Sequence, residues 1–304
     1  MTWHARRSVI AVTVLLLAGC RSETSDAPPS DPATPTDAPQ PTASPTPSQV
    51  DHEVRSRLVD VGGYRIAVRC DGSGEPALIF EGGHLNAQAS ADYSIVQATM
   101  VEEGVGRVCW YDRAGLGESE PRRPGPVDAA RLAEELHLAL ERLDIRPPYV
   151  LAGGSFGGLL VRSYQQLYPA EVGGLMFIDA VEVRHPLVTL GALDVVVEGR
   201  SRIDMKALER ELRSAPRLGD LPVIVITAGF EASELEWMDA QRRLADLSTN
   251  SIHFIARGAS HGVTNEVPEL VSEASKMLLH AAATRSRLPS CGASLEGLGA
   301  RCVK

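Results

Sequence analysis

A five-residue turn at 153–157, GGSFG, constrains the fold of this chain more than any other feature. It matches the pattern G-x-S-x-G and separates a short apolar run, 149–152, from a stretch with helical character, 159–168. A serine on so tight a strand-to-helix turn is presented at the helix N-terminus, where backbone N–H groups favour an oxyanion. The pattern alone also occurs in passive glycine-rich loops. The flanking strand and helix therefore carry the prediction that Ser155 is a nucleophile.

A nucleophilic serine needs a base, and the sequence offers eight histidines. His261 lies in a loop directly after the apolar run 251–256 and before another helical stretch. It also follows Ser155 in the chain, in the order serine, acid, histidine. His84 falls near the predicted oxyanion loop. The remaining histidines are less suited as a base: they lie in the leader (His4), at the exit of a linker (His52), in amphipathic helical stretches (His137, His280), inside an apolar run (His253) and between strands (His185). We therefore predict His261 as the base, against the alternative of a histidine on a surface loop.

Apolar runs alternate with helical stretches along most of the chain. This alternation predicts a mostly parallel, doubly wound sheet that is covered on both faces. The runs are 77–80, 108–111, 149–152, 175–178, 223–227 and 252–256, and the helical stretches are 128–143, 159–168, 234–247 and 267–283. Two earlier runs, 57–61 and 64–70, meet at Gly62-Gly63 and predict an antiparallel edge hairpin. Ser155, Gly83, Asp179 and His261 all follow predicted strands, so they are expected to converge at the carboxyl edge.

Four segments in this order resemble the α/β-hydrolase family. Beside the GGSFG turn, 78–84 (LIFEGGH) resembles the third strand and its oxyanion loop, with Glu81 where the family usually has histidine. The segment 108–119 (VCWYDRAGLGES) resembles the fourth strand and its D-R-x-G-x-G-x-S turn, and 175–179 (LMFID) the sixth strand. The likeness extends over about 57–280. It implies an oxyanion hole formed by the N–H groups of Phe156 and Gly83, beside His84, and implies no cofactor and no metal.

The resemblance leaves the acid of the catalytic triad open. The acid should lie between Ser155 and His261 in the chain, after either the sixth or the seventh strand. Asp179 follows the sixth strand directly and is the first choice, although an aspartate there is also structural in some relatives. The loop after the seventh strand usually carries an aspartate but here offers Glu231, the second choice. Glu182 is the third.

The segment of about 180–221 separates the sixth and seventh strands and is too long for an ordinary loop. It predicts a small cap over the site. Its apolar residues can line an acyl pocket or simply pack the cap onto the core; they are Leu187, Leu190, Leu193 and residues 195–197.

The N-terminus predicts export. A positive start at 4–7 precedes an apolar run, 9–18, too short to span a bilayer, which is typical of a secretory signal. Leu17-Ala18-Gly19-Cys20 resembles the bacterial lipobox, so 1–19 is expected to be the signal peptide and Cys20 the lipidated residue, against an ordinary signal with an incidental cysteine. Residues 20–50 are rich in Pro, Ser and Thr and predict a tether. The hydrolase domain would then occupy 51–304, outside the cytoplasm and anchored to the membrane.

The net charge bears on the class of binding partner, and the cysteine content bears on disulfide bonding. A net charge of −9 without a basic stripe argues against nucleic-acid binding. Four cysteines besides Cys20 suggest disulfides in an exported protein. The strand order of the family implies Cys70–Cys109, and the pair Cys291–Cys302 would close a glycine-rich tail; free thiols are the alternative. Sequence thus predicts a serine hydrolase for a small or lipid-like ester, thioester or amide, the alternatives being an acyltransferase or a non-catalytic binding lipoprotein.

Overall fold

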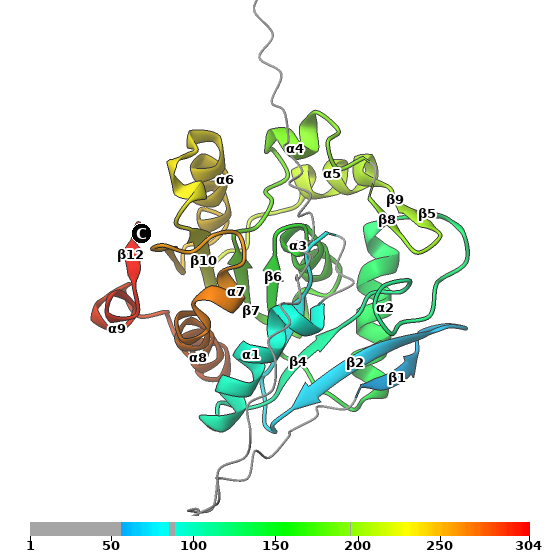
Figure 1. The fold of residues 1–304 in the computed structure, drawn as a ribbon, viewed down its shortest axis with the longest axis horizontal. Helices are drawn as coiled ribbons and strands as arrows, with labels where there is room; N and C mark the ends of the chain where they lie inside the picture. The colour runs from blue at the N-terminus through cyan, green and yellow to red at the C-terminus, as the bar shows by residue number, and fades with distance from the viewer. Residues whose placement is uncertain (1–55, 85–88, 195) are drawn as a thin grey trace, which may run out of the picture. The chain divides into compact units, whose positions relative to one another are not determined.

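The computed structural model describes residues 56–84, 89–194 and 196–304 (Figure 1). The predicted signal peptide, lipidated Cys20 and tether lie outside the described residues. A nine-stranded sheet has the order β1-β2-β4-β3-β6-β7-β10-β11-β12. Its strands are β1 (Arg57–Asp60), β2 (Arg65–Asp71), β3 (Ala77–Glu81), β4 (Val108–Tyr111), β6 (Tyr149–Gly154), β7 (Val172–Ile178), β10 (Val223–Ala228), β11 (Ser251–Ala256) and β12 (Ala300–Cys302).

The centre of this sheet is parallel and its edges are antiparallel. All pairings between β4, β3, β6, β7, β10 and β11 are parallel, whereas β1–β2, β2–β4 and β11–β12 are antiparallel. The predicted hairpin turns at Gly62 and Gly63, which have φ values of 105° and 100° that suit glycine. The predicted mostly parallel sheet with its edge hairpin is confirmed.

Helices cover both faces, and residues that alternate along the strands feed two cores. Leu78 and Phe80 pack with α1 (Ala89–Glu102) and α8 (Pro268–Thr284), while Ala77 and Ile79 face the opposite core. That opposite core is completed by α2 (Ala129–Arg142), α3 (Gly157–Leu167) and α6 (Leu235–Ala245). Both layers of helices are visible around the sheet in Figure 1.

A cap lies between β7 and β10, where the sequence predicted one. It contains α4 (Pro186–Thr189), β8 (Val197–Glu198), β9 (Ser201–Ile203) and α5 (Met205–Ser214). The strand β5 (Gly125–Val127), far away in sequence, joins it to form a three-stranded sheet of order β5-β9-β8. Val188 and Val196 pack in an apolar core beneath the cap, with Leu193 partly buried beside them, whereas Leu187 and Leu190 are exposed. The cap residues therefore mainly hold the cap to the domain.

Two disulfides tie the sheet at its edges. Cys70 on β2 is bonded to Cys109 on β4, which are partners in the strand register, and Cys291 is bonded to Cys302 on β12. Both expected pairs are therefore present. Among the described residues, no helix combines the length and the apolar character needed to cross a bilayer.

Candidate active site

Ser155 occupies a strained turn between β6 and α3. Its φ is 50°, a left-handed value that is uncommon for a residue with a side chain. Three backbone hydrogen bonds hold it there: its N–H donates to the carbonyl of Ile178 at 3.1 Å, and its carbonyl accepts from Gly158 at 3.1 Å and Val181 at 2.9 Å. The sharp turn predicted from the GGSFG pattern is therefore observed.

Glycines bring the oxyanion loop next to this turn. A Cβ atom at Gly157 would lie 2.4 Å from the carbonyl oxygen of Glu81, so only glycine lets the start of α3 approach the end of β3. A Cβ atom at Gly83 would lie 3.3 Å from Cβ of Ser155. The backbone of Gly83 thus passes directly beside the serine, where the sequence predicted an oxyanion donor.

The serine opens into a cavity of about 250 Å³. Its lining comes from the oxyanion loop, the serine turn and the loop after β11, and also from α1, the end of β7 and the short helix α7 (Val263–Glu266). The lining residues are Gly83, His84, Tyr93, Gly154, Ser155, Ile178, His261, Gly262 and Thr264. Two predicted site residues from distant parts of the chain, Ser155 and His261, therefore face one cavity.

Asp179 is hydrogen-bonded to His261. The distance from Oδ2 of Asp179 to Nδ1 of His261 is 2.6 Å. The other carboxylate oxygen accepts the N–H of Ala228 at 3.0 Å and the indole N–H of Trp237 at 2.7 Å. Asp179 is fully buried, with a φ of 43°, whereas the side chain of His261 is half exposed. This carboxylate is thus fixed on one side and presented to the histidine on the other, as an orienting acid requires.

The two other candidate acids differ in position. Glu231 lies close to the pair of Asp179 and His261. A carboxylate oxygen of Glu231, a carboxylate oxygen of Asp179 and a ring nitrogen of His261 all lie within 4.8 Å of one another. Burial raises the pKa of Glu231, and the negative charge of Asp179 adds to the shift. Glu182 instead bonds Arg243 at 2.7 Å and the amide of Arg184 at 3.1 Å, and lines a different cavity. The geometry therefore favours Asp179, keeps Glu231 near and places Glu182 elsewhere.

The same three side chains are the group best suited to a metal among the residues that the structure describes. Both oxygens of Asp179 already accept hydrogen bonds from the protein, one of them from His261. A cation would have to compete with those bonds, so we assign the group no metal-binding role.

Arg113 organises the oxyanion loop, a role that the sequence analysis missed. Its guanidinium donates to the carbonyls of Gly82 at 2.7 Å and Gly83 at 2.8 Å. It also pairs with Glu81 at 2.5 Å and with Glu198 of the cap at 2.7 Å. By binding these two carbonyl oxygens, Arg113 holds the peptide groups of the loop beside Ser155 in place. The unusual Glu81 followed by an arginine in the D-R turn was the available signal.

Charges in this buried group compensate one another. Burial raises the pKa of Glu81, and the neighbouring Arg113 opposes that shift. Burial alone would lower the pKa of Arg113, but the charges of Glu198 and Glu81 outweigh it and the pKa is raised. Tyr111 donates its hydroxyl hydrogen to Glu81 as well. Glu81 is therefore an ion-pair partner that replaces the histidine usual in the family.

His84 presents an unused polar atom at this site. Its Nδ1 is buried without a hydrogen-bond partner, and its ring lies edge-on to Phe156 at 6.5 Å between centroids. Burial lowers the pKa of His84, and the charge of Arg113 lowers it further. A neutral histidine lining the cavity can exchange a hydrogen bond with a bound substrate.

A family model described as alpha/beta hydrolase fold matches residues 82–199. This stretch contains the oxyanion loop, the D-R turn and the serine turn, in the topology described above. The protein has the α/β-hydrolase fold. Solved structures agree: a serine hydrolase involved in carbazole degradation, the CarC enzyme, superposes with a TM-score of 0.56 at 17% identity, over 74% of this chain and 98% of that one.

Two further comparisons support the fold. A thermophilic esterase from Thermogutta terrifontis has a TM-score of 0.55 at 18% identity, over 75% of this chain and 99% of that chain. The uncharacterized protein YqjL of Bacillus subtilis (strain 168) is 24% identical over 215 residues, which cover 66% of this chain and 82% of YqjL. At such identities these likenesses establish the α/β-hydrolase fold and leave the activity to be argued from the site.

Proposed function

We propose that this α/β-hydrolase-fold protein is a serine hydrolase that cleaves carboxylic esters through an acyl-enzyme. The observation that carries the proposal is the 2.6 Å bond between Asp179 and His261, with His261 and Ser155 lining the same cavity. The esterase and serine hydrolase among the structural neighbours support the same class of reaction. Thioesters and amides would react by the same steps.

Each proposed residue has one role. Oγ of Ser155 attacks the acyl carbon while His261 takes its proton and Asp179 stabilises the resulting imidazolium. The N–H groups of Phe156 and Gly83 would bind the oxyanion, and Arg113 holds the loop that carries Gly83. His261 then protonates the leaving alcohol. Water, deprotonated by His261, attacks the acyl-enzyme and releases the acid and Ser155.

The size of the cavity bears on the substrate. A volume of about 250 Å³ is below the usual range for sites that enclose large ligands. We therefore propose that esters with short acyl chains are better substrates than long ones. A longer alcohol portion could extend past the half-exposed His261 toward solvent.

Export and lipid anchoring at Cys20 belong to the same proposal. They are supported by the leader sequence and the lipobox at 17–20 alone. Replacement of Cys20 by alanine should move the protein from the membrane fraction to the soluble fraction or leave it unprocessed. An unmodified N-terminus elsewhere, found by mass spectrometry, would contradict the anchor.

The activity is tested with p-nitrophenyl esters of acyl chains from two to sixteen carbons. Wild type should turn over the short esters, and Ser155→Ala should lose at least about 10³-fold. Ser163→Ala, on the helix α3 that follows the Ser155 turn but outside the cavity, is the matched control and should keep wild-type turnover. Covalent acylation without hydrolysis would instead indicate acyl transfer. Absence of acylation from every ester would favour the non-catalytic binding protein.

A further inference from the structure

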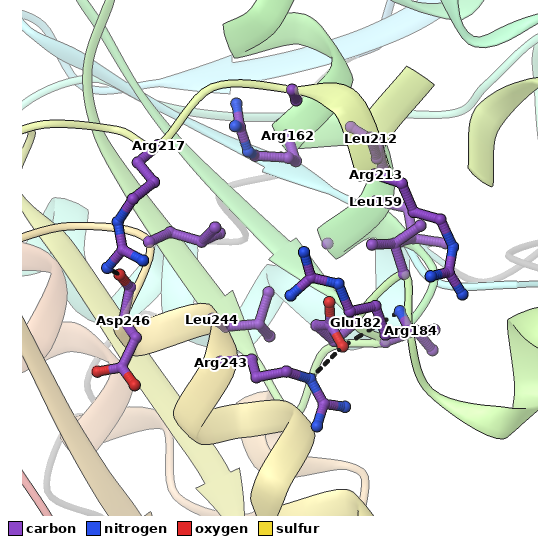
Figure 2. A pocket seen from close by; sticks show the side chains of 15 residues that line it. Leu159, Arg162, Glu182, Arg184, Leu212, Arg213, Arg217, Arg243, Leu244 and Asp246 are labelled. Carbon is purple, nitrogen blue, oxygen red and sulfur yellow. Dashed lines mark hydrogen bonds and ion pairs between the residues drawn. The ribbon is translucent and has the colours of Figure 1, made fainter. Parts of the chain in front are cut away.

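A second cavity, of about 260 Å³, is lined in part by α3, the helix that follows the turn of Ser155. Its walls come from α3, the segment that follows Asp179, the end of α5 and α6, and it shares no lining residue with the serine cavity. Figure 2 shows five arginines around it, Arg162, Arg184, Arg213, Arg217 and Arg243. We call it the arginine cavity. The acidic residues that line it are Glu182 and Asp246.

Ion pairs within the protein satisfy only part of this positive charge. Arg243 pairs with Glu182 at 2.7 Å and Arg213 with Glu209 at 2.8 Å, while the carboxylate of Asp246 pairs with Lys304 at 3.1 Å. Among the described residues, no carboxylate lies within 4.0 Å of the guanidinium groups of Arg162, Arg184 and Arg217. The cavity therefore carries an uncompensated positive charge.

The burial of Arg162 means that this unmatched charge lowers the stability of the folded protein. The residue is only 5% exposed, and its hydrogen bonds go to two neutral acceptors, the side chain of Gln165 and the carbonyl of Pro216. Burial lowers the pKa of Arg162 to about 10, but the group still carries its charge at neutral pH. A buried charge without an opposite charge destabilises a protein, so a bound anion would remove a penalty as well as form new bonds.

Apolar side chains complete the wall. Leu159, Val181 and Leu212 are buried beside the arginines, and Leu244 lies opposite them in Figure 2. A ligand that filled the cavity would thus place an anionic head against the guanidinium groups and an apolar part against leucine and valine. Guanidinium groups bind phosphate through paired N–H donors.

We propose that the arginine cavity binds an organic phosphate monoester with an apolar substituent. A phosphate monoester carries about −1.5 to −2 charges near neutral pH, which suits three unmatched guanidinium groups better than the single charge of a carboxylate. The head group is held by Arg162, Arg184 and Arg217. This site is independent of the proposed ester hydrolysis, because the two cavities have no residue in common.

Isothermal titration calorimetry of the full chain with n-octyl phosphate tests this binding. Octyl phosphate should bind saturably and at least about tenfold more tightly than inorganic phosphate, because its alkyl chain is buried too. Octanoate should bind more weakly than octyl phosphate, and octyl glucoside should not bind. Arg162→Gln and Arg217→Gln should each weaken octyl phosphate by about tenfold or more. Arg217 is exposed, so its variant tests the site even if Arg162→Gln does not fold.

Arg242→Gln is the matched control. Arg242 is next to Arg243 on α6 but pairs with Asp239 and does not line the cavity, so its loss should leave binding unchanged. The phosphate could belong to a lipid head group or to a soluble ester, and vesicles of phosphatidylcholine with and without phosphatidic acid distinguish these two sources. Binding to the acidic vesicles that is abolished by Arg217→Gln indicates a lipid head group. Binding of octyl phosphate without binding to the vesicles indicates a soluble ester. Either supports the site. The proposal is overturned if octyl phosphate gives no saturable binding, or if Arg217→Gln and Arg242→Gln bind it equally.

Discussion

The serine cavity and the arginine cavity are nearly equal in volume, about 250 and 260 Å³, but differ in how their charges are matched. Around the serine, Asp179 faces His261 and Arg113 faces two glutamates. Around the second cavity, the nearly buried Arg162 has only neutral acceptors. A buried arginine is therefore matched by two carboxylates in one place and by neutral acceptors alone in the other.

The pKa values of the two arginines express this difference. Burial lowers the pKa of both; around Arg113 the charges of Glu198 and Glu81 reverse the effect, whereas for Arg162 burial acts alone. The glutamates that compensate Arg113 are thus part of the same contacts that hold the loop beside Ser155. Removal of one charge should therefore lower stability strongly where the charges are matched and only slightly where they are not.

Asp179→Asn should have the largest effect. Asparagine cannot stabilise the imidazolium and favours the wrong tautomer of His261, so kcat/KM for a p-nitrophenyl ester should fall by about 10⁴-fold. Circular dichroism should show an intact fold. Glu231→Gln and Glu182→Gln are the isosteric controls, each expected to lose less than about tenfold. A larger loss in Glu231→Gln than in Asp179→Asn would move the acid to the loop after β10.

Arg113→Met should cost about 3–5 kcal/mol of unfolding free energy, because it leaves Glu81 and Glu198 buried without their shared counter-ion. Urea unfolding followed by fluorescence measures this loss. Arg242→Met removes an exposed arginine and should change the unfolding free energy by less than about 0.5 kcal/mol. Equal stability of the two variants would show that the ion pairs of Arg113 do not support the loop.

His253 is a buried base that, unlike the two arginines, is neutral at neutral pH, so pH can be used to vary the cost of burying its charge. Burial lowers the pKa of His253 to about 4, against an ordinary value of 6.5, and its ring is hydrogen-bonded to Thr227 at 2.8 Å. Between pH 6.5 and pH 4 the histidine is therefore protonated in the unfolded chain but neutral in the folded chain. Stability from this residue should be complete above pH 6.5 and fall by about 3 kcal/mol as pH drops to 4.

Urea unfolding at several values between pH 7.5 and pH 4 checks this pH dependence. His253→Gln should remove that part of the decline, and the exposed His280→Gln should retain it. A decline that is the same in both variants would assign the acid sensitivity to other groups.

Arg162→Met should have the smallest effect on stability. Without an anion the variant loses an unmatched buried charge and gains an apolar side chain, so its unfolding free energy should stay within about 1 kcal/mol of wild type, or rise. The same urea assay, in buffer without phosphate or sulfate, measures it. A loss as large as that of Arg113→Met would mean that Arg162 is already compensated.

The sequence predicted what depends on local pattern. The GGSFG turn and the apolar runs are short-range patterns, and the disulfide between Cys70 and Cys109 was expected from the likeness to a known family. The structure contains all three. Helix α1 and strands β5 and β12 were missed: β5 and β12 are only three residues long, and α1 has no clear apolar stripe. Their places are set by tertiary contacts, which propensity does not encode.

The candidate site likewise contains residues that the sequence predicted and residues that it did not. Ser155, His261 and Asp179 were predicted because each follows a strand, and strand ends converge in a parallel sheet. The roles of Arg113 and Trp237 were not predicted, because they depend on partners 30–85 and 58 residues away in sequence. The arginine cavity joins residues of α3, α5 and α6 and leaves no contiguous motif to read.

The most direct test of the account is to locate the adduct of a fluorophosphonate probe by peptide mass spectrometry. Wild type and Ser163→Ala should carry one adduct, on Ser155, and Ser155→Ala should carry none. His261→Ala should react at least about 10³-fold more slowly, because the serine then lacks its base. An adduct on another residue, or equal labelling of wild type and Ser155→Ala, would contradict the assignment of Ser155 as the nucleophile.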